Sequence, residues 1–205
     1  MTFVAVRSLF RFLHRDGRVF QNPTVRLREG TRPKPPILPL TAQDYARVTA
    51  RADTPLHRVV LVLVAVHGAR PYMVRHLQLD DVDTAHGRLT VAGVQRPLEG
   101  LSARALQDWL HHRHQRWPLT ANPHLLVSEV SALTTAPVSA TLLVTLFAGT
   151  GVSLDRMRMD RYLEEALAHG PDPLHLASVF GISEATSLRY TAEARHLVQT
   201  IERPQ

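Results

Sequence analysis

The sequence predicts a mainly α-helical protein with one small antiparallel β-sheet, and three observations support this fold class. Apolar residues recur at helical spacing through most of the chain, for example in residues 4–14 and 153–169. Two short runs, residues 88–91 and 94–98, flank an Ala-Gly pair, which is typical of a β-hairpin. The 205 residues are 44% hydrophobic, which is enough to fill the core of one folded domain.

The N-terminal part predicts a helix followed by an extended segment. A helix is expected over residues 4–14, and five prolines follow between residues 18 and 39. Proline removes a backbone donor and disfavours helix in the residue before it, so this segment predicts a linker. We therefore expect a helical segment at residues 1–22, a Pro-rich linker at 23–40 and the main domain at 41–203.

Capping residues mark the helices of the main domain. Thr41 and Asp44 have the spacing of a capping box for a helix over residues 42–52. Residues 56–67 are apolar on all sides and predict a buried helix ended by glycine, although residues 59–66 also fit an interior strand. Further helices are expected over residues 102–117, 138–147, 153–169, 173–180 and 183–202, with Ser102, Ser153 and Ser183 as N-caps and a buried strand or turn at 125–127.

The charge balance indicates a polyanionic partner. The formal net charge is +6, the pI is near 10.6, and Lys34 is the only lysine among 24 basic residues. The guanidinium group of arginine can bind two phosphate oxygens at once, so double-stranded DNA is the expected partner. The alternative is that a GC-rich genome converts lysine to arginine and leaves these charges on solvated faces.

Several classes of protein are disfavoured by composition. The absence of cysteine excludes disulfides and thiolate zinc sites and fits a reducing compartment. The longest apolar run, residues 59–66, is too short to cross a membrane, and the first twenty residues show no export signal. We expect a cytoplasmic protein without a membrane partner.

Four short motifs follow one another along the chain. They are Val66-His67-Gly68-Ala69-Arg70 with the acidic run 77–83, the strand 94–98 containing Arg96, the helix start Asp155-Arg156-Met157-Arg158, and Gly181-Ile182-Ser183 leading to Tyr190. Over about residues 38–195 this order resembles the catalytic domain of the tyrosine recombinases, or phage integrases, especially divergent actinobacterial ones. The resemblance implies that the helix and linker before it are the remnant of an N-terminal core-binding domain.

The resemblance also implies a chemistry, namely DNA strand breakage and rejoining through a 3′-phosphotyrosyl intermediate, with no cofactor and no metal. Tyr190 would attack phosphorus while Arg70 and Arg158 hold the phosphate oxygens, and Arg161 is a substitute for Arg158. Each residue also has a structural interpretation. Arg158 can pair with Asp155 one turn away, and Tyr190 can be a core residue with a wet hydroxyl.

The groups that transfer protons in the family are missing from these motifs. The hairpin lysine is replaced by Arg96, whose pKa makes it a poor acid near neutrality. The two histidine positions of the later motifs hold Asp155 and Ile182. Because general acid–base catalysis contributes about 10²–10⁴-fold, the resemblance implies an impaired or inactive recombinase.

The same C-terminal window also fits a helix-turn-helix. Ala177 and Gly181 match its small-residue and turn positions, which gives a second interpretation: a non-catalytic DNA-binding protein, either a transcriptional regulator or a decayed integrase. A helical protein-interaction domain is a third. The expected DNA contacts under the first two are Arg96, Arg156, Arg161, Ser183, Thr186 and Arg189, with a homo-oligomer on DNA as a further expectation. Asp108 and His112 lie four residues apart, so they could bind a metal on one face of a helix, but a solvated basic helix is the better interpretation.

Overall fold

The computed structural model describes residues 3–25 and 37–202, and it divides the chain into two units, residues 1–36 and 37–205. The first unit contains α1 (Phe3–Arg15) and the turns that follow it. In these turns Asn22 accepts hydrogen bonds from the backbone and the hydroxyl of Thr24. Most of the predicted linker lies outside the described residues, and the second unit begins at Ile37, before the expected boundary.

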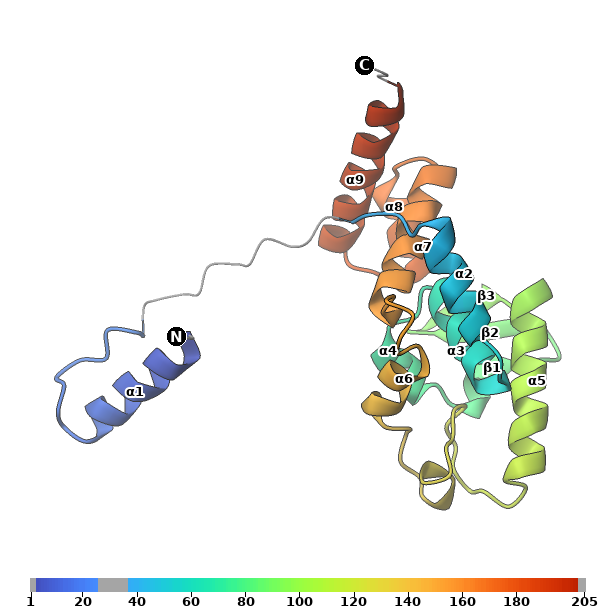
Figure 1. The fold of residues 1–205 in the computed structure, drawn as a ribbon, viewed down its shortest axis with the longest axis horizontal. Coiled ribbons are helices and arrows are strands. Elements are labelled where there is room, and N and C mark those ends of the chain that lie inside the picture. The colour runs from blue at the N-terminus through green and yellow to red at the C-terminus, as the bar shows by residue number, and fades with distance from the viewer. Residues whose placement is uncertain (1–2, 26–36, 203–205) are drawn as a thin grey trace. The chain divides into compact units, whose positions relative to one another are not determined.

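The second unit is mostly helical with one small sheet, which confirms the expected fold class (Figure 1). Its elements are α2 (Ala42–Arg51), α3 (Pro55–Ala65), α4 (Pro71–His76), η1 (Leu79–Asp81), β1 (Val82–Asp83), β2 (Arg88–Val91), β3 (Val94–Pro97), α5 (Gly100–Arg116), η2 (Ser131–Leu133), α6 (Ala140–Leu146), α7 (Leu154–Ala168), α8 (Pro173–Phe180) and α9 (Glu184–Glu202). No helix in the described part of the chain is long and apolar enough to cross a bilayer.

The sheet has the order β1-β2-β3, with both pairings antiparallel. Ala92 and Gly93 form the two-residue turn of the predicted hairpin, with φ angles of 55° and 77°. Positive φ at both positions matches the turn type that follows the twist of paired strands. The two-residue strand β1 was not predicted.

Two apolar clusters hold the second unit together. The larger one surrounds α3, which is helical rather than an interior strand, and includes Leu63 of α3 and Trp109 of α5. Trp109 is buried and donates its indole N–H to the carbonyl of Leu125 at 2.9 Å, so the loop at 125–127 is tied to α5. The smaller cluster gathers Ile37 with side chains of α7, α8 and α9, including Tyr162, Phe180 and Tyr190.

Two of the predicted caps are present, and one is wrong. Thr41 and Asp44 form the expected capping box, and Ser153 caps α7 by accepting from the backbone N–H of Arg156. Ser102 does not cap α5, which already begins at Gly100. Ser102 is buried, and its hydroxyl lies 3.1 Å from Nε2 of His67. A contact with a residue distant in sequence thus takes the place of the expected hydrogen bond to the helix backbone.

Candidate functional site

The turn after α3 is held by a tyrosine from a distant helix. Gly68 has a φ of +61°, and the hydroxyl of Tyr162 on α7 donates to its carbonyl at 2.7 Å. A Cβ at position 68 would lie 2.6 Å from Cε1 of Tyr162 and 2.8 Å from Cδ1 of Phe180, so the space admits only glycine. The turn then delivers Arg70, whose exposed side chain stands at the start of α4.

Two of the three predicted catalytic residues, Arg158 and Tyr190, lie against Tyr162. Its ring lies edge-on to the ring of Tyr190, with centroids 5.3 Å apart, and the guanidinium of Arg158 lies 5.2 Å from its centroid. The same ring contacts Phe180 at 4.5 Å. Tyr162 therefore contacts three groups that are far apart in sequence: the backbone of the turn before Arg70, the Arg158 side chain and the Tyr190 ring.

Arg158 forms the ion pair that was one of its two expected roles, and its contact with phosphate stays a prediction. Nη2 lies 2.9 Å from Oδ1 of Asp155, so the ion pair one turn away is present. Its side chain is only 13% exposed. Burial alone would lower the pKa of Arg158, but the neighbouring Tyr162 and Asp155 outweigh burial and raise it. The guanidinium is therefore held as a cation beside both tyrosines.

Tyr190 is a core residue in this structure. It is 3% exposed and packs in the smaller apolar cluster with Tyr162 and Ala194. Burial raises the pKa of its hydroxyl, and the positive charges of Arg158 and Arg189 only partly oppose that rise. The packing interpretation placed Tyr190 in the core with a solvated hydroxyl, whereas the whole residue is buried here. Its role as a nucleophile stays a prediction.

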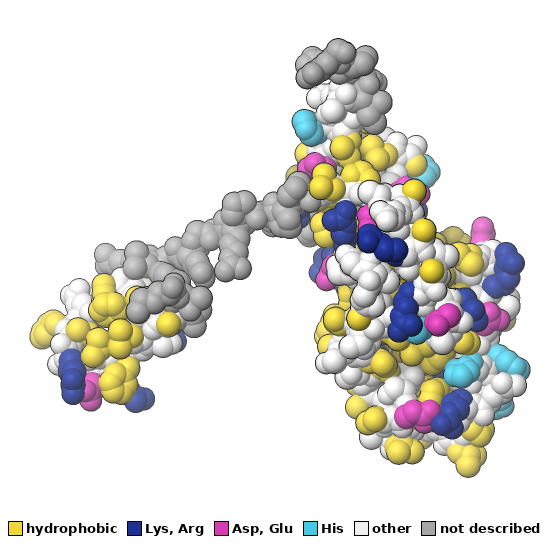
Figure 2. All heavy atoms as spheres, in the orientation of Figure 1, with side chains coloured by type: hydrophobic (Ala, Val, Ile, Leu, Met, Phe, Trp, Pro, Cys, Tyr) yellow, Lys and Arg dark blue, Asp and Glu magenta, His cyan; other side chains and the backbone are white. Residues whose placement is uncertain are grey.

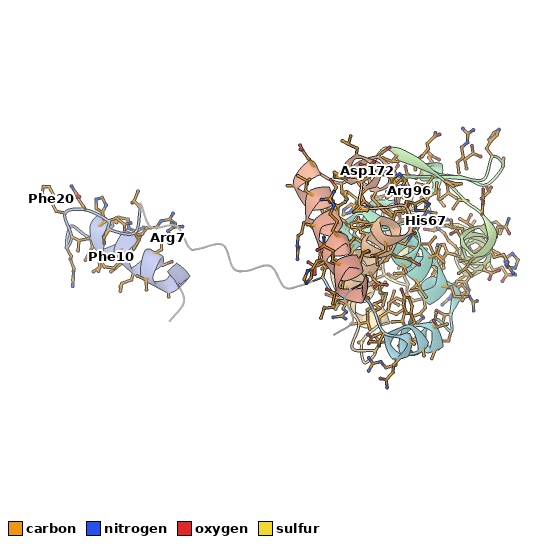
Figure 3. All side chains as sticks on the ribbon, turned by 90° about the horizontal axis from the view of Figure 1, so that it is seen from above. Arg7, Phe10, Phe20, His67, Arg96 and Asp172 are labelled. Atoms are coloured by element: carbon orange, nitrogen blue, oxygen red, sulfur yellow. The ribbon has the colours of Figure 1, made fainter. Side chains whose placement is uncertain are left out.

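Arg96 and His67 are both buried and lie close enough to interact electrostatically (Figure 3). Arg96 is 7% exposed, and Nη2 donates to the Phe180 carbonyl at 3.1 Å. Nε and Nη1 of this guanidinium are buried without a hydrogen-bond partner. Burial lowers the pKa of Arg96, and burial together with the charges of Arg96 and Arg161 lowers the pKa of His67 to about 4. The Arg96 guanidinium is thus bonded inward, to the end of α8.

The other residues predicted to contact DNA differ in solvent exposure and in their hydrogen-bond partners. Arg161 is held by Glu165 through Nη2 at 2.6 Å and by the Val66 carbonyl through Nε at 3.2 Å. Ser183 is exposed and shares a hydrogen bond with the Thr186 hydroxyl at 2.9 Å. Arg156, Thr186 and Arg189 are partly buried. Their contacts with DNA stay predictions.

The corner between α8 and α9 has the apolar support that the helix-turn-helix template requires. Gly181 adopts a left-handed φ of 61° and ends α8, while Leu176, Phe180 and Ile182 are buried in the smaller cluster. Leu188, expected as support, is 46% exposed. Whether this corner reads DNA stays a prediction.

Solved structures identify the arrangement of these elements. The XerA recombinase matches with a TM-score of 0.63 and 21% identity, over 100% of this chain and 84% of that one. The XerH recombinase bound to palindromic difH matches with a TM-score of 0.66 and 14% identity, over 97% of this chain and 64% of that one. This chain has the tyrosine recombinase fold. The Tn1549 transposon integrase bound to circular intermediate DNA also shares the fold, with a TM-score of 0.60 and 14% identity over 94% of this chain and 75% of that one.

The match to the recombinase fold comes from structure alone. No protein-family model matches the sequence, and no curated protein does. Sequence reasoning missed Tyr162 and His67, whose contacts lie 94 and 35 residues away along the chain. The one local signal was Gly68 itself, because a glycine directly after a buried helix often marks a close approach by another element.

Proposed function

We propose that this chain is a DNA-binding protein of the site-specific recombinase and integrase type whose cleavage chemistry is impaired. The observation that supports it best is the gathering of the Gly68 turn, Arg158 and Tyr190 around Tyr162. The net charge of +6 favours a polyanion. The lambda integrase dimer bound to its core site, with a TM-score of 0.59, is a further DNA complex of this fold.

In this proposal Arg70 and Arg158 neutralise the non-bridging oxygens of one phosphate, and Tyr190 attacks its phosphorus. The new bond joins the phenolic oxygen to phosphorus, and the bond to the 5′-oxygen breaks. That oxygen must take up a proton, and Tyr190 must lose one. The hairpin position expected to supply the acid holds Arg96, which is buried and donates to the Phe180 carbonyl. Without a group to transfer these protons, turnover is slow or absent.

The proposed DNA surface comprises Arg156, Arg161, Ser183, Thr186 and Arg189. Ser183 precedes Glu184 at the start of α9, and backbone N–H groups at the start of a helix favour phosphate. We propose that the chain acts on double-stranded DNA in the cytoplasm, as a homo-oligomer on its site and without a cofactor. The α8–α9 corner is itself part of the recombinase fold, so it does not favour a transcriptional regulator.

The test combines binding and covalent capture. Nicked suicide duplexes with a randomised core are incubated with the wild type, Tyr190→Phe and the control Tyr72→Phe, whose tyrosine is 68% exposed on α4. We expect salt-sensitive binding by all three chains and at most a trace of covalent adduct, present in the wild type and Tyr72→Phe and absent from Tyr190→Phe. Adduct that persists in Tyr190→Phe would refute Tyr190 as the nucleophile, and no binding to any duplex would refute the DNA-binding function.

A further inference from the structure

Three side chains with metal-ligand atoms meet where α7 passes into α8. Oε1 of Glu165 lies 3.1 Å from Nδ1 of His169 and 2.8 Å from Nε2 of His175. All three ligand atoms lie within 4.8 Å of one another. Within residues 3–25 and 37–202, this is the one cluster of three such groups, and sequence reasoning expected no metal here.

The local fold explains why these groups converge. His169 comes one helical turn after Glu165, directly after the last residue of α7. Gly170, with a φ of 84°, reverses the chain, and Asp172 caps α8 by accepting from the backbone N–H of Leu174. His175 therefore lies in the first turn of α8 and faces back toward α7. The two imidazole rings lie 5.3 Å apart at 32° to each other.

The distances fit a tetrahedral ion. Zinc binds imidazole nitrogen and carboxylate oxygen at about 2.0–2.2 Å, which separates neighbouring ligand atoms by roughly 3.3 Å. Oε1 is 3.1 and 2.8 Å from the two nitrogens, and both distances are shorter than that separation, so the histidines move away from Oε1 when an ion enters. His169 is 59% exposed and His175 35%, which leaves room for that movement and for water as the fourth ligand.

The carboxylate is already oriented for a single bond to metal. Glu165 is only 8% exposed, and its other oxygen, Oε2, is held by Nη2 of Arg161 at 2.6 Å. An outer partner that fixes a ligating carboxylate is a regular feature of metal sites. The ordered carboxylate thus presents its other oxygen, Oε1, to the two histidine nitrogens.

We propose that Glu165, His169 and His175 bind one Zn²⁺ ion that fastens the end of α7 to the start of α8. Arg161 is a positioning residue, since it holds Glu165 on one side and the Val66 carbonyl on the other. The ion is thereby linked through one side chain to the turn that carries Gly68. Without zinc, both histidines contact the Glu165 carboxylate, and the test distinguishes the two states.

Zinc affinity is measured by competition with a chromophoric chelator, using the full chain without a histidine tag. We expect one Zn²⁺ per chain at pH 7.5. Affinity falls at pH 5.5, because protons compete for the histidine nitrogens. His169→Ala, His175→Ala and Glu165→Gln each remove a ligand, so each lowers the affinity by more than about 100-fold, beyond the 10–100-fold typical of outer partners. Zinc raises the melting temperature of the wild type and leaves that of the three variants unchanged.

The matched control is the double variant His111→Ala/His114→Ala, which removes two exposed histidines from α5. Figure 2 shows histidine side chains on the surface over this helix. We expect its affinity to stay within about 2-fold of the wild type, since it keeps all three ligands. No stoichiometric zinc, or equal affinity in the wild type and the three ligand variants, would overturn the proposal. No DNA enters the measurement, so the recombinase proposal is tested separately.

Discussion

Replacing Gly68 by alanine tests whether the turn is built around Tyr162. The φ of +61° places an alanine in the left-handed region, which costs about 1–2 kcal/mol. The new Cβ would lie 2.6 Å from Tyr162 and 2.8 Å from Phe180, both buried rings of the smaller cluster. Overpacking of this kind costs about 1–3 kcal/mol. We expect Gly68→Ala to lower the free energy of unfolding by roughly 2–5 kcal/mol and the melting temperature by roughly 4–20 °C.

The assay is urea unfolding followed by circular dichroism, with Gly93→Ala as the matched control. Gly93 also has a positive φ, 77°, but nothing lies within 4 Å of its added Cβ. This control carries the backbone cost alone, about 1–2 kcal/mol. The difference between the two variants therefore measures the contact with the two rings. If Gly68→Ala costs no more than Gly93→Ala, the close packing of the turn on α7 is refuted.

Three further predictions concern the same region. Tyr162→Phe leaves the Gly68 carbonyl without its hydroxyl donor and lowers the free energy of unfolding by about 1–3 kcal/mol; chemical denaturation measures this, and no loss would contradict the bond. The pKa of His67 is about 4 in the folded chain against about 6.5 unfolded, so protonation favours unfolding. The neutral His67 contributes on the order of 3 kcal/mol to the free energy of unfolding above pH 6.5, and this contribution is lost as the pH falls toward 4. Between pH 7 and pH 4.5 the free energy of unfolding should therefore fall less in His67→Gln than in the wild type. Equal falls would contradict the lowered pKa. Duplex affinity should fall linearly in a plot of log affinity against log salt, with Arg156→Gln reducing the slope by roughly 0.9; an unchanged slope would remove Arg156 from the phosphate contacts.

The sequence was sufficient to predict elements whose signals are local. The capping box of Thr41 and Asp44 and the Ala-Gly turn depend on neighbours within three residues, and both are present. The two-residue strand β1 was missed because it is too short to show an alternating pattern. Ser102 was assigned as a cap because its chemistry suits that role, but its hydroxyl contacts His67, 35 residues away. Such pairings depend on the fold rather than on spacing.

The residues of the candidate site also divide into those that a local motif indicated and those that only the fold brings together. Arg70, Arg158 and Tyr190 were selected from motifs, but nothing local indicated Tyr162, which contacts the ring of Tyr190 and the guanidinium of Arg158. Arg96 was placed correctly on the second hairpin strand, yet its burial could not be predicted, since it depends on the end of α8 packing over β3. The proposed zinc ligands could not be predicted from spacing, because Glu165 and His175 lie on different helices and meet only through the turn at Gly170.

The burial of Ile37 beside α7, α8 and α9 has a consequence for synthesis on the ribosome. Ile37 is 1% exposed and shares its cluster with Ala194, so the cluster that covers the first residue of the second unit is complete only once residue 194 has been made. At about 5–20 residues per second, the interval between making these two residues is roughly 8–30 s. During that time the nascent chain presents an apolar side chain without its complete native cover, so this cluster closes only after the C-terminal helix is made.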